Sequence, residues 1–179
     1  MPTLVICEKN NAAQRVAIIL SGGKSSKTYL NRVPVFRFPW KGTELIVVGL
    51  RGHILNFDYP KRFKNWDIDD LKELVDTKPV KYSTASWITN TLQDLGKQAD
   101  TVIVATDFDR EGELIGAEAL SAMNLKPDIK IKRARFSALT KPEIESAFEN
   151  LIELDNNLAL SAETRQIVDL AWGAILTRF

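Results

Sequence analysis

The stretch that decides the fold is residues 101–113, which reads Thr101-Val102-Ile103-Val104-Ala105-Thr106-Asp107-Phe108-Asp109-Arg110-Glu111-Gly112-Glu113. Its first half is a continuous apolar run, which is typical of a parallel strand covered on both faces. Its second half is rich in acids and leads into a helical pattern that reaches Met123. In open α/β sheets, ligands bind beyond the carboxyl ends of the strands. The stretch therefore predicts an α/β fold with a ligand site where this strand ends.

Strand and helix patterns alternate along the rest of the chain. This alternation predicts a layered α/β domain with a central, mainly parallel sheet flanked by helices. We place this domain at residues 1–150 and expect residues 151–179 to begin a following helical domain. The last helical pattern still runs at Thr177-Arg178-Phe179 without a helix-ending Gly, Asn or Pro, so we expect a truncated piece of a longer chain. The expected strands are residues 4–7, 35–38, 44–50, 101–106 and 130–136, with a loop at 21–28; the expected helices are 12–20, 67–75, 85–95, 111–123 and 142–150, and one from about Ser161.

The composition excludes several classes of protein. The 179 residues are 45% hydrophobic and 26% charged with a net charge of +1, which excludes disordered, collagen-like and coiled-coil chains. No apolar run approaches the roughly 20 residues of a membrane span, and the first residues lack the features of a signal peptide. We therefore expect a cytoplasmic protein without a membrane partner. The single cysteine, Cys7, excludes an internal disulfide and a cysteine-rich zinc site, and we expect it to be a buried apolar residue.

Three acids follow the apolar strand at alternate positions. Side chains two residues apart on an extended segment point the same way, so Asp107, Asp109 and Glu111 can converge. Crowded carboxylates repel one another unless a cation joins them, and a few carboxylates completed by water and phosphate describe a Mg²⁺ site. The alternative is that the acids only favour the positive end of the helix, at about 0.3–1 kcal/mol each. That alternative explains Glu111 and Glu113 better than it explains two aspartates.

A second charged pair, Glu8-Lys9, ends the first predicted strand. Because the carboxyl ends of parallel strands lie on one edge of a sheet, we expect Glu8 near Asp107 and Asp109. A carboxyl group beside other carboxylates holds its proton more tightly, which suits a general acid or base. The alternative is an ordinary glutamate at the end of a strand.

The charges are also segregated along the chain. Residues 107–113 hold four acids and one base, whereas residues 126–135 hold five bases and one acid. An acidic focus beside a basic stripe suits a metal-assisted site for a phosphate-rich polymer, although solvated charged surfaces look much the same.

These stretches together resemble a known family. Glu8-Lys9 and Asp107-x-Asp109-x-Glu111, each after an apolar strand, resemble the metal site of Toprim domains. The longer string of residues 105–116 resembles the form found in type IA DNA topoisomerases, and the Gly-Leu-Arg-Gly-His variant at residues 49–53 is similar to archaeal members. Further similar segments, in the family's order, are Gly52-His53-Ile54, residues 136–141, residues 165–170, Trp172-Gly173 and Thr177-Arg178.

The resemblance implies a Toprim, Rossmann-like fold in an isomerase that relaxes DNA by Mg²⁺-dependent cleavage and religation of a single strand. Glu8 would protonate the departing 3′ oxygen and later take that proton back. Asp107, Asp109 and Glu111 would position Mg²⁺, with Asp107 acting through water, and Glu113 would support the acidic site.

The resemblance also implies residues that contact DNA. Lys9 and Arg110 would hold backbone phosphates, and Arg165 and Asp169 on the last helix would contact single-stranded DNA. The alternative for the last two is a surface ion pair four residues apart. For His53, which we count as a supporting residue, a hydrogen bond within a loop is favoured over catalysis.

The nucleophile of the family is absent from this stretch. The family uses a tyrosine in a Tyr-Pro-Arg context within a later domain, and Tyr59-Pro60-Lys61-Arg62 imitates that context in the wrong place, a few residues after Gly-His. We therefore expect the segment to be inactive alone, with single-stranded DNA and the remaining domains of the same polypeptide as partners, in the cytoplasm with the nucleoid. Two alternatives stay open, namely another Toprim enzyme such as a nuclease or primase, and a regulatory binding module.

Overall fold

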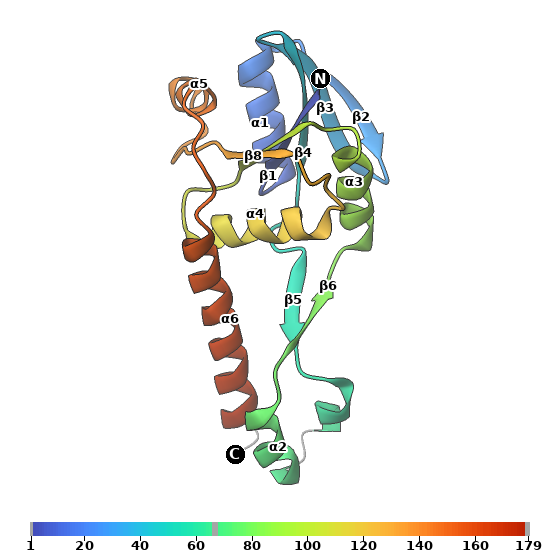
Figure 1. The fold of residues 1–179 in the computed structure, drawn as a ribbon, viewed down its shortest axis with the longest axis vertical. Coiled ribbons are helices and arrows are strands. Elements are labelled where there is room, and N and C mark those ends of the chain that lie inside the picture. Colours follow the sequence, from blue (N-terminus) through green and yellow to red (C-terminus); the bar gives the residue numbers. More distant parts are fainter. Residues whose placement is uncertain (1, 66–67, 178–179) are drawn as a thin grey trace.

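A six-stranded sheet forms the centre of the computed structural model, which describes residues 2–65 and 68–177 (Figure 1). The strand order is β2-β3-β4-β1-β7-β8. β1 is parallel to both β4 and β7, and β7 is parallel to β8, whereas β3 is antiparallel to β2 and β4. The expected α/β fold with a mainly parallel central sheet is therefore confirmed. The bounds are β1 Pro2–Cys7, β2 Ser26–Leu30, β3 Val33–Trp40, β4 Thr43–Gly49, β7 Thr101–Ala105 and β8 Lys130–Arg133.

Helices cover both faces of this sheet. On one face Val5 of β1 belongs to a core cluster with residues of α1 (Asn10–Ser21) and α5 (Lys141–Glu149). On the other face Leu4 and Ile6 join residues of α3 (Ser86–Gly96) and α4 (Arg110–Ala122). Each such buried aliphatic side chain contributes roughly 1.5–3 kcal/mol. A strand that is apolar on both faces is thus explained by two helical layers, and Cys7 is buried in it as expected.

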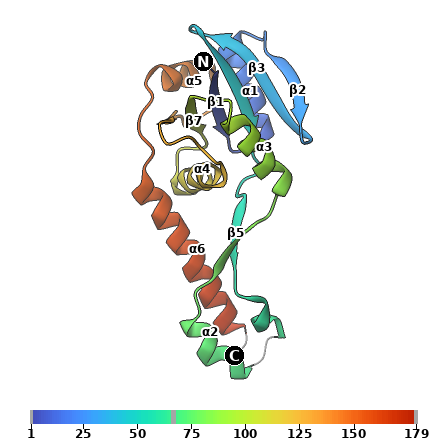
Figure 2. The ribbon, with the colours of Figure 1, turned by 45° about the vertical axis from the view of Figure 1, so that its right-hand side comes forward.

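A second lobe extends away from the sheet. It consists of an antiparallel ribbon, β5 (Leu55–Asp58) and β6 (Val80–Ser83), followed outward by short helical turns and α2 (Leu71–Asp76). The long helix α6 (Asn156–Leu176) runs from α4 along this ribbon to α2 (Figures 1 and 2). A small apolar cluster joins them. The short turns are η1 (Lys61–Asn65) and η2 (Ile68–Asp70), and the cluster contains Tyr59, Phe63, Leu74, Leu170, Ala174 and Ile175.

Several expected boundaries were wrong. α6 begins at Asn156 rather than near Ser161, because the Asp155 carboxylate caps it by accepting from the Leu158 amide at 2.9 Å. β2 begins at Ser26, inside the stretch expected to be a loop, and β8 ends at Arg133. The expected start of a helix at residue 67 and the residues at 178–179 lie outside the described residues, and the division of the chain at residue 150 stays a prediction. Within the described ranges no helix has the length and hydropathy that crossing a bilayer requires.

The two hairpin turns of the sheet have left-handed backbones. Asn31 and Arg32 join β2 to β3 with φ of 48° and 68°, and Lys41 and Gly42 join β3 to β4 with φ of 46° and 83°. Two-residue hairpin turns of this type (I′) need positive φ at both positions, which is why Asn-Gly is the preferred pair. A left-handed conformation costs a residue with a side chain roughly 1–2 kcal/mol. Arg32 therefore occupies a position where glycine would be more stable.

The contact between the end of β4 and the first turn of α1 leaves no space for a side chain. A Cβ atom at Gly49 would lie 2.6 Å from backbone atoms of Lys9 and Asn10. We expect Gly49→Ala to lower the free energy of unfolding, measured by chemical denaturation, by about 3 kcal/mol, the upper end of overpacking penalties. The control is Gly173→Ala in α6, where open space surrounds the new methyl group and a gain of about 0.5–1 kcal/mol is expected. Equal effects of the two substitutions would contradict this packing.

Candidate functional site

The carboxyl ends of β1, β4 and β7 lie side by side, because Cys7 is in register with Gly49 on one side and with Ala105 on the other. The chain leaves β1 at Glu8 and leaves β7 toward Asp107. The pKa of Asp107 is raised above its ordinary value, first because its carboxyl is partly removed from water and then by the negative charges of Glu8 and Asp109. The structure thus brings Glu8 together with both aspartates at one edge of the sheet.

Glu8 is held in place and accompanied by a cation. Its side chain is 14% exposed, and one carboxylate oxygen lies 3.0 Å from the ammonium nitrogen of Lys9. That hydrogen bond and charge raise the pKa of Lys9. The Glu8 carbonyl accepts a hydrogen bond from the Gly52 amide at 3.1 Å, and the backbones of Lys9 and Arg51 form an isolated antiparallel β-bridge. The first strand end is therefore tied to the loop that follows β4.

Asp109 has a structural task as well. It is the N-cap of α4, where its carboxylate accepts from the Gly112 amide at 2.7 Å. A Cβ atom at Gly112 would lie 2.0 Å from the Asp107 carbonyl oxygen, so only glycine permits this turn. The helix-end role considered for the acids is thus fulfilled by an aspartate. One carboxylate oxygen of Asp109 accepts this capping hydrogen bond, and the second oxygen takes no part in it.

Glu111 is directed toward cations rather than toward Glu8. Its carboxylate lies 3.4 Å from the outer ring nitrogen of His53 and 3.8 Å from the guanidinium of Arg165. Arg110, which we expected to contact a backbone phosphate, is half exposed, and its guanidinium lies 4.0 Å from the Glu111 carboxylate. Glu111 therefore belongs to a network that joins α4 to α6.

The carboxylates do not form a ready-made metal centre. In residues 2–65 and 68–177, no three or more His, Cys, Asp or Glu side chains are grouped so that they could hold a metal ion. The donors at the edge are all carboxylate oxygens, which Mg²⁺ prefers. The pKa of Asp107 is raised first by its partial removal from water and then by repulsion from Glu8 and Asp109, and a cation would relieve this repulsion. To bind an ion, Glu8 would first have to leave Lys9, and Glu111 would have to leave its basic neighbours on α4, α6 and the loop after β4.

Beneath the acids lies a buried ion pair that supports the end of β7. The Arg133 side chain donates to the Glu113 carboxylate at 2.6 Å, and both side chains are at most 1% exposed. Glu113 is thus held in the interior by Arg133 rather than exposed among the other acids. Arg133 belongs to the basic stripe that we associated with phosphate, and its burial excludes that role. Its other N–H groups donate to the carbonyls of Val104 (3.3 Å), Thr106 (2.9 Å), Asp107 (2.8 Å) and Ala134 (2.6 Å).

His53 joins the loop after β4 to helices α4 and α6. One ring nitrogen lies 3.0 Å from the carboxylate of Glu118, which is 3% exposed in its side chain, and the other lies 3.3 Å from the Gln166 amide. The hydrogen bond to Glu118 is the main reason that the pKa of His53 is raised. Sequence reasoning missed Glu118, although its position two helical turns after Glu111 was a signal that the two share a face.

The DNA-contact candidates on α6 lie beside this network. Arg165 lies 3.5 Å from the carboxylate of Asp169, so the ion pair considered as the alternative is present. The contact of Arg165 with Glu111 also ties the helix to the acidic edge. Arg165 and Asp169 are both more than half exposed and available to a partner.

Comparison with known proteins follows the same segments. The Toprim domain family matches residues 3–139. DNA topoisomerase 1 of Archaeoglobus fulgidus is 45% identical over 180 residues, covering 99% of this chain and 26% of that protein. Human DNA topoisomerase 3-alpha is 32% identical over 185 residues, covering 98% of this chain and 18% of that protein. Full-length topoisomerase I of Thermotoga maritima shares the fold, with a TM-score of 0.60 at 22% identity over 93% of this chain and 24% of that chain. The chain thus spans about a quarter or less of these proteins.

The buried pair should be far more sensitive to substitution than an exposed one. Glu113→Gln leaves the Arg133 guanidinium buried without its carboxylate, and we expect a loss of about 3–5 kcal/mol in unfolding free energy. The matched control is Glu149→Gln, which removes the exposed partner of Lys41 and should cost about 0–1 kcal/mol. Denaturant titration compares them, and losses of equal size would refute the supporting role of Glu113.

The His53 network should make stability depend on pH. Because the pKa of folded His53 is raised, its protonated form stabilises the fold. That stability is fully present below the unfolded value of about 6.5 and is lost as the pH rises through the folded pKa. We therefore expect the unfolding free energy to fall more steeply with rising pH above about 6.5 in the parent chain than in His53→Gln. Parallel curves for the two chains would contradict the network.

Proposed function

The chain belongs to the Toprim domain family, and from this we propose that it supplies the Mg²⁺-dependent acid–base part of a type IA DNA topoisomerase. It is similar over nearly its whole length to proteins named DNA topoisomerase 1 and 3-alpha. The observation that carries the proposal is the meeting of Glu8 with Asp107 and Asp109: the pKa of Asp107 is raised first by its partial burial and then by the charges of Glu8 and Asp109. The whole protein would relax DNA by cutting and resealing one strand.

Each residue of the edge would have a distinct task. Glu8 would hold the proton that goes to the departing 3′ oxygen and would accept it again on resealing. Lys9, whose ammonium group is beside Glu8 and largely exposed, would pair with a backbone phosphate. Bound Mg²⁺ would neutralise phosphate charge. Asp107, Asp109 and Glu111 would hold it, with Glu111 released from its cations.

The nucleophile would come from elsewhere in a longer polypeptide. Tyr59 is 8% exposed and packs in the apolar cluster of the second lobe, apart from the strand ends. Tyr29 and Tyr82 are exposed, but they belong to β2 and β6 rather than to the acidic edge. Arg165 and Asp169 would contact single-stranded DNA beside Glu111. We expect the protein to act in the cytoplasm on the nucleoid.

Calorimetric titration of Mg²⁺ into the 179-residue chain tests the metal assignment. We expect the Glu8→Gln, Asp107→Asn double variant to bind Mg²⁺ at least about tenfold more weakly, because two of the crowded charges are removed. Asp109→Asn keeps a capping side chain and should weaken binding without unfolding α4. The control Asp94→Asn removes an exposed carboxylate from α3 and should change nothing.

Identical Mg²⁺ affinities in all of these chains would overturn the metal assignment. A nicking assay on single-stranded DNA accompanies the titration. The chain should not turn over, since it lacks the tyrosine. Turnover that depends on Glu8 would instead favour a self-contained Toprim nuclease.

A further inference from the structure

A second pocket lies next to the acidic edge. It has a volume of about 480 Å³, within the roughly 300–1,000 Å³ of ligand sites, and is formed by the β2–β3 turn, the loop after β4 and the start of α3. Arg51 connects it to the candidate site, because Arg51 is bridged to Lys9 and the next amide donates to the Glu8 carbonyl. The lining residues are Asn31, Arg32, Arg51, Trp87 and Asn90.

The side chains of this pocket combine positive charge with an exposed aromatic ring. The Arg51 guanidinium lies 5.9 Å from the centre of the Trp87 ring, and Trp87 is 41% exposed. None of the ion pairs in the described parts of the chain involves Arg32 or Arg51. Unpaired guanidinium groups bind phosphate, and exposed aromatic rings stack on bases of single strands. The side-chain amides of Asn31 and Asn90 add donors and acceptors for a base edge.

The backbone conformation of the β2–β3 turn is a further argument for a role of the pocket. Arg32 has a φ of 68°, a left-handed conformation that stability alone would give to glycine, as it does at Gly42 in the β3–β4 turn. Strained residues are retained where the side chain has a task. In this turn the side chain of Arg32 lines the pocket together with that of Arg51, so the pocket holds two guanidinium groups.

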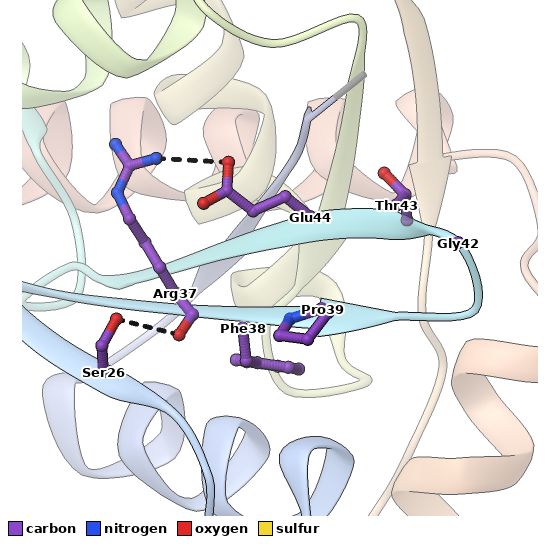
Figure 3. A pocket seen from close by; sticks show the side chains of 7 residues that line it. All are labelled: Ser26, Arg37, Phe38, Pro39, Gly42, Thr43 and Glu44. Atoms are coloured by element: carbon purple, nitrogen blue, oxygen red, sulfur yellow. Dashed lines mark hydrogen bonds and ion pairs between the residues drawn. The ribbon is translucent and has the colours of Figure 1, made fainter.

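A larger pocket at the opposite edge of the sheet provides a contrast. Figure 3 shows this pocket of about 610 Å³, where Arg37 faces Glu44 at 3.5 Å and the Ser26 hydroxyl donates to the Arg37 carbonyl at 3.1 Å. Its arginine is already neutralised by a carboxylate. The pocket therefore offers no free charge to a phosphate, although it is larger.

We infer that the Arg32–Arg51–Trp87 pocket holds one nucleotide of a single-stranded DNA segment, with the phosphate on the arginines and the base on Trp87. The inference rests on the proposed function, since it extends the path of the DNA from the Glu8 edge across the end of β4 to α3. Charge and stacking are tolerant of base identity, so the pocket should bind any sequence.

Fluorescence anisotropy with a labelled oligothymidylate tests the pocket in the 179-residue chain. Trp87→Ala should weaken binding about fivefold to tenfold through lost stacking, with Trp87→Phe in between. Arg51→Ala and Arg32→Gly should each reduce the salt slope of log K by about 0.7, one phosphate contact in a single strand. Arg32→Gly should also raise the melting temperature, because the turn is relieved of strain. Lys24→Ala removes one exposed charge at the opposite edge and is the matched control.

A probe with abasic sugars separates stacking from charge. Trp87→Ala and the parent chain should bind that probe equally, while the arginine variants should still bind it more weakly. Suppose that the parent chain binds both oligothymidylate and Mg²⁺. If the pocket variants then bind oligothymidylate with the same affinity as Lys24→Ala, the inference is overturned and the proposed function is not. A parent chain that binds neither would overturn the proposed function as well.

Discussion

The parallel register of β1 with its two neighbours is the constraint on which the candidate site depends. Because Cys7 lies opposite both Gly49 and Ala105, the three strands end at one level, and the residues that follow them share one edge. A shift of one residue would exchange the two faces of β1. Val5 packs on one helical layer while Leu4 and Ile6 pack on the other, so the two cores together fix the register that brings the acids into proximity.

A buried charge pair then shapes the end of β7. The Arg133 guanidinium donates to backbone carbonyls before and after the strand end, including that of Asp107. Its partner Glu113 also accepts from the Asp155 amide at 3.3 Å, immediately before α6. Buried pairs seldom stabilise a fold more than apolar packing would. The value of this pair lies in orientation, because a rigid planar group with several donors holds the loop that carries Asp107 and links it to the long helix.

Sequence patterns predicted those parts of the fold and of the candidate site that depend on runs of apolar residues and on the order of the strands. The unbroken apolar runs around residues 4–7 and 101–106 indicate strands buried on both faces, and strand-end acids on such strands must meet. Other features leave no such pattern. The strands β5 and β6 alternate apolar and polar residues, but each has only 4 residues and little buried surface, so the pattern is too short to stand out. Arg133 looks like any basic residue of a surface strand. The capping role of Asp109 depends on the backbone of one turn, which spacing does not reveal.

The central claim is that Glu8 and the aspartates after β7 form one electrostatic unit that accepts a divalent cation. Carboxyl carbon NMR of Asp107, titrated with pH in the presence and absence of Mg²⁺, measures this most directly. The account predicts a pKa above the ordinary value of about 3.9 without the ion, a fall toward that value in Glu8→Gln, and a larger fall when Mg²⁺ is added. An ordinary pKa that neither Glu8→Gln nor Mg²⁺ changes would contradict it.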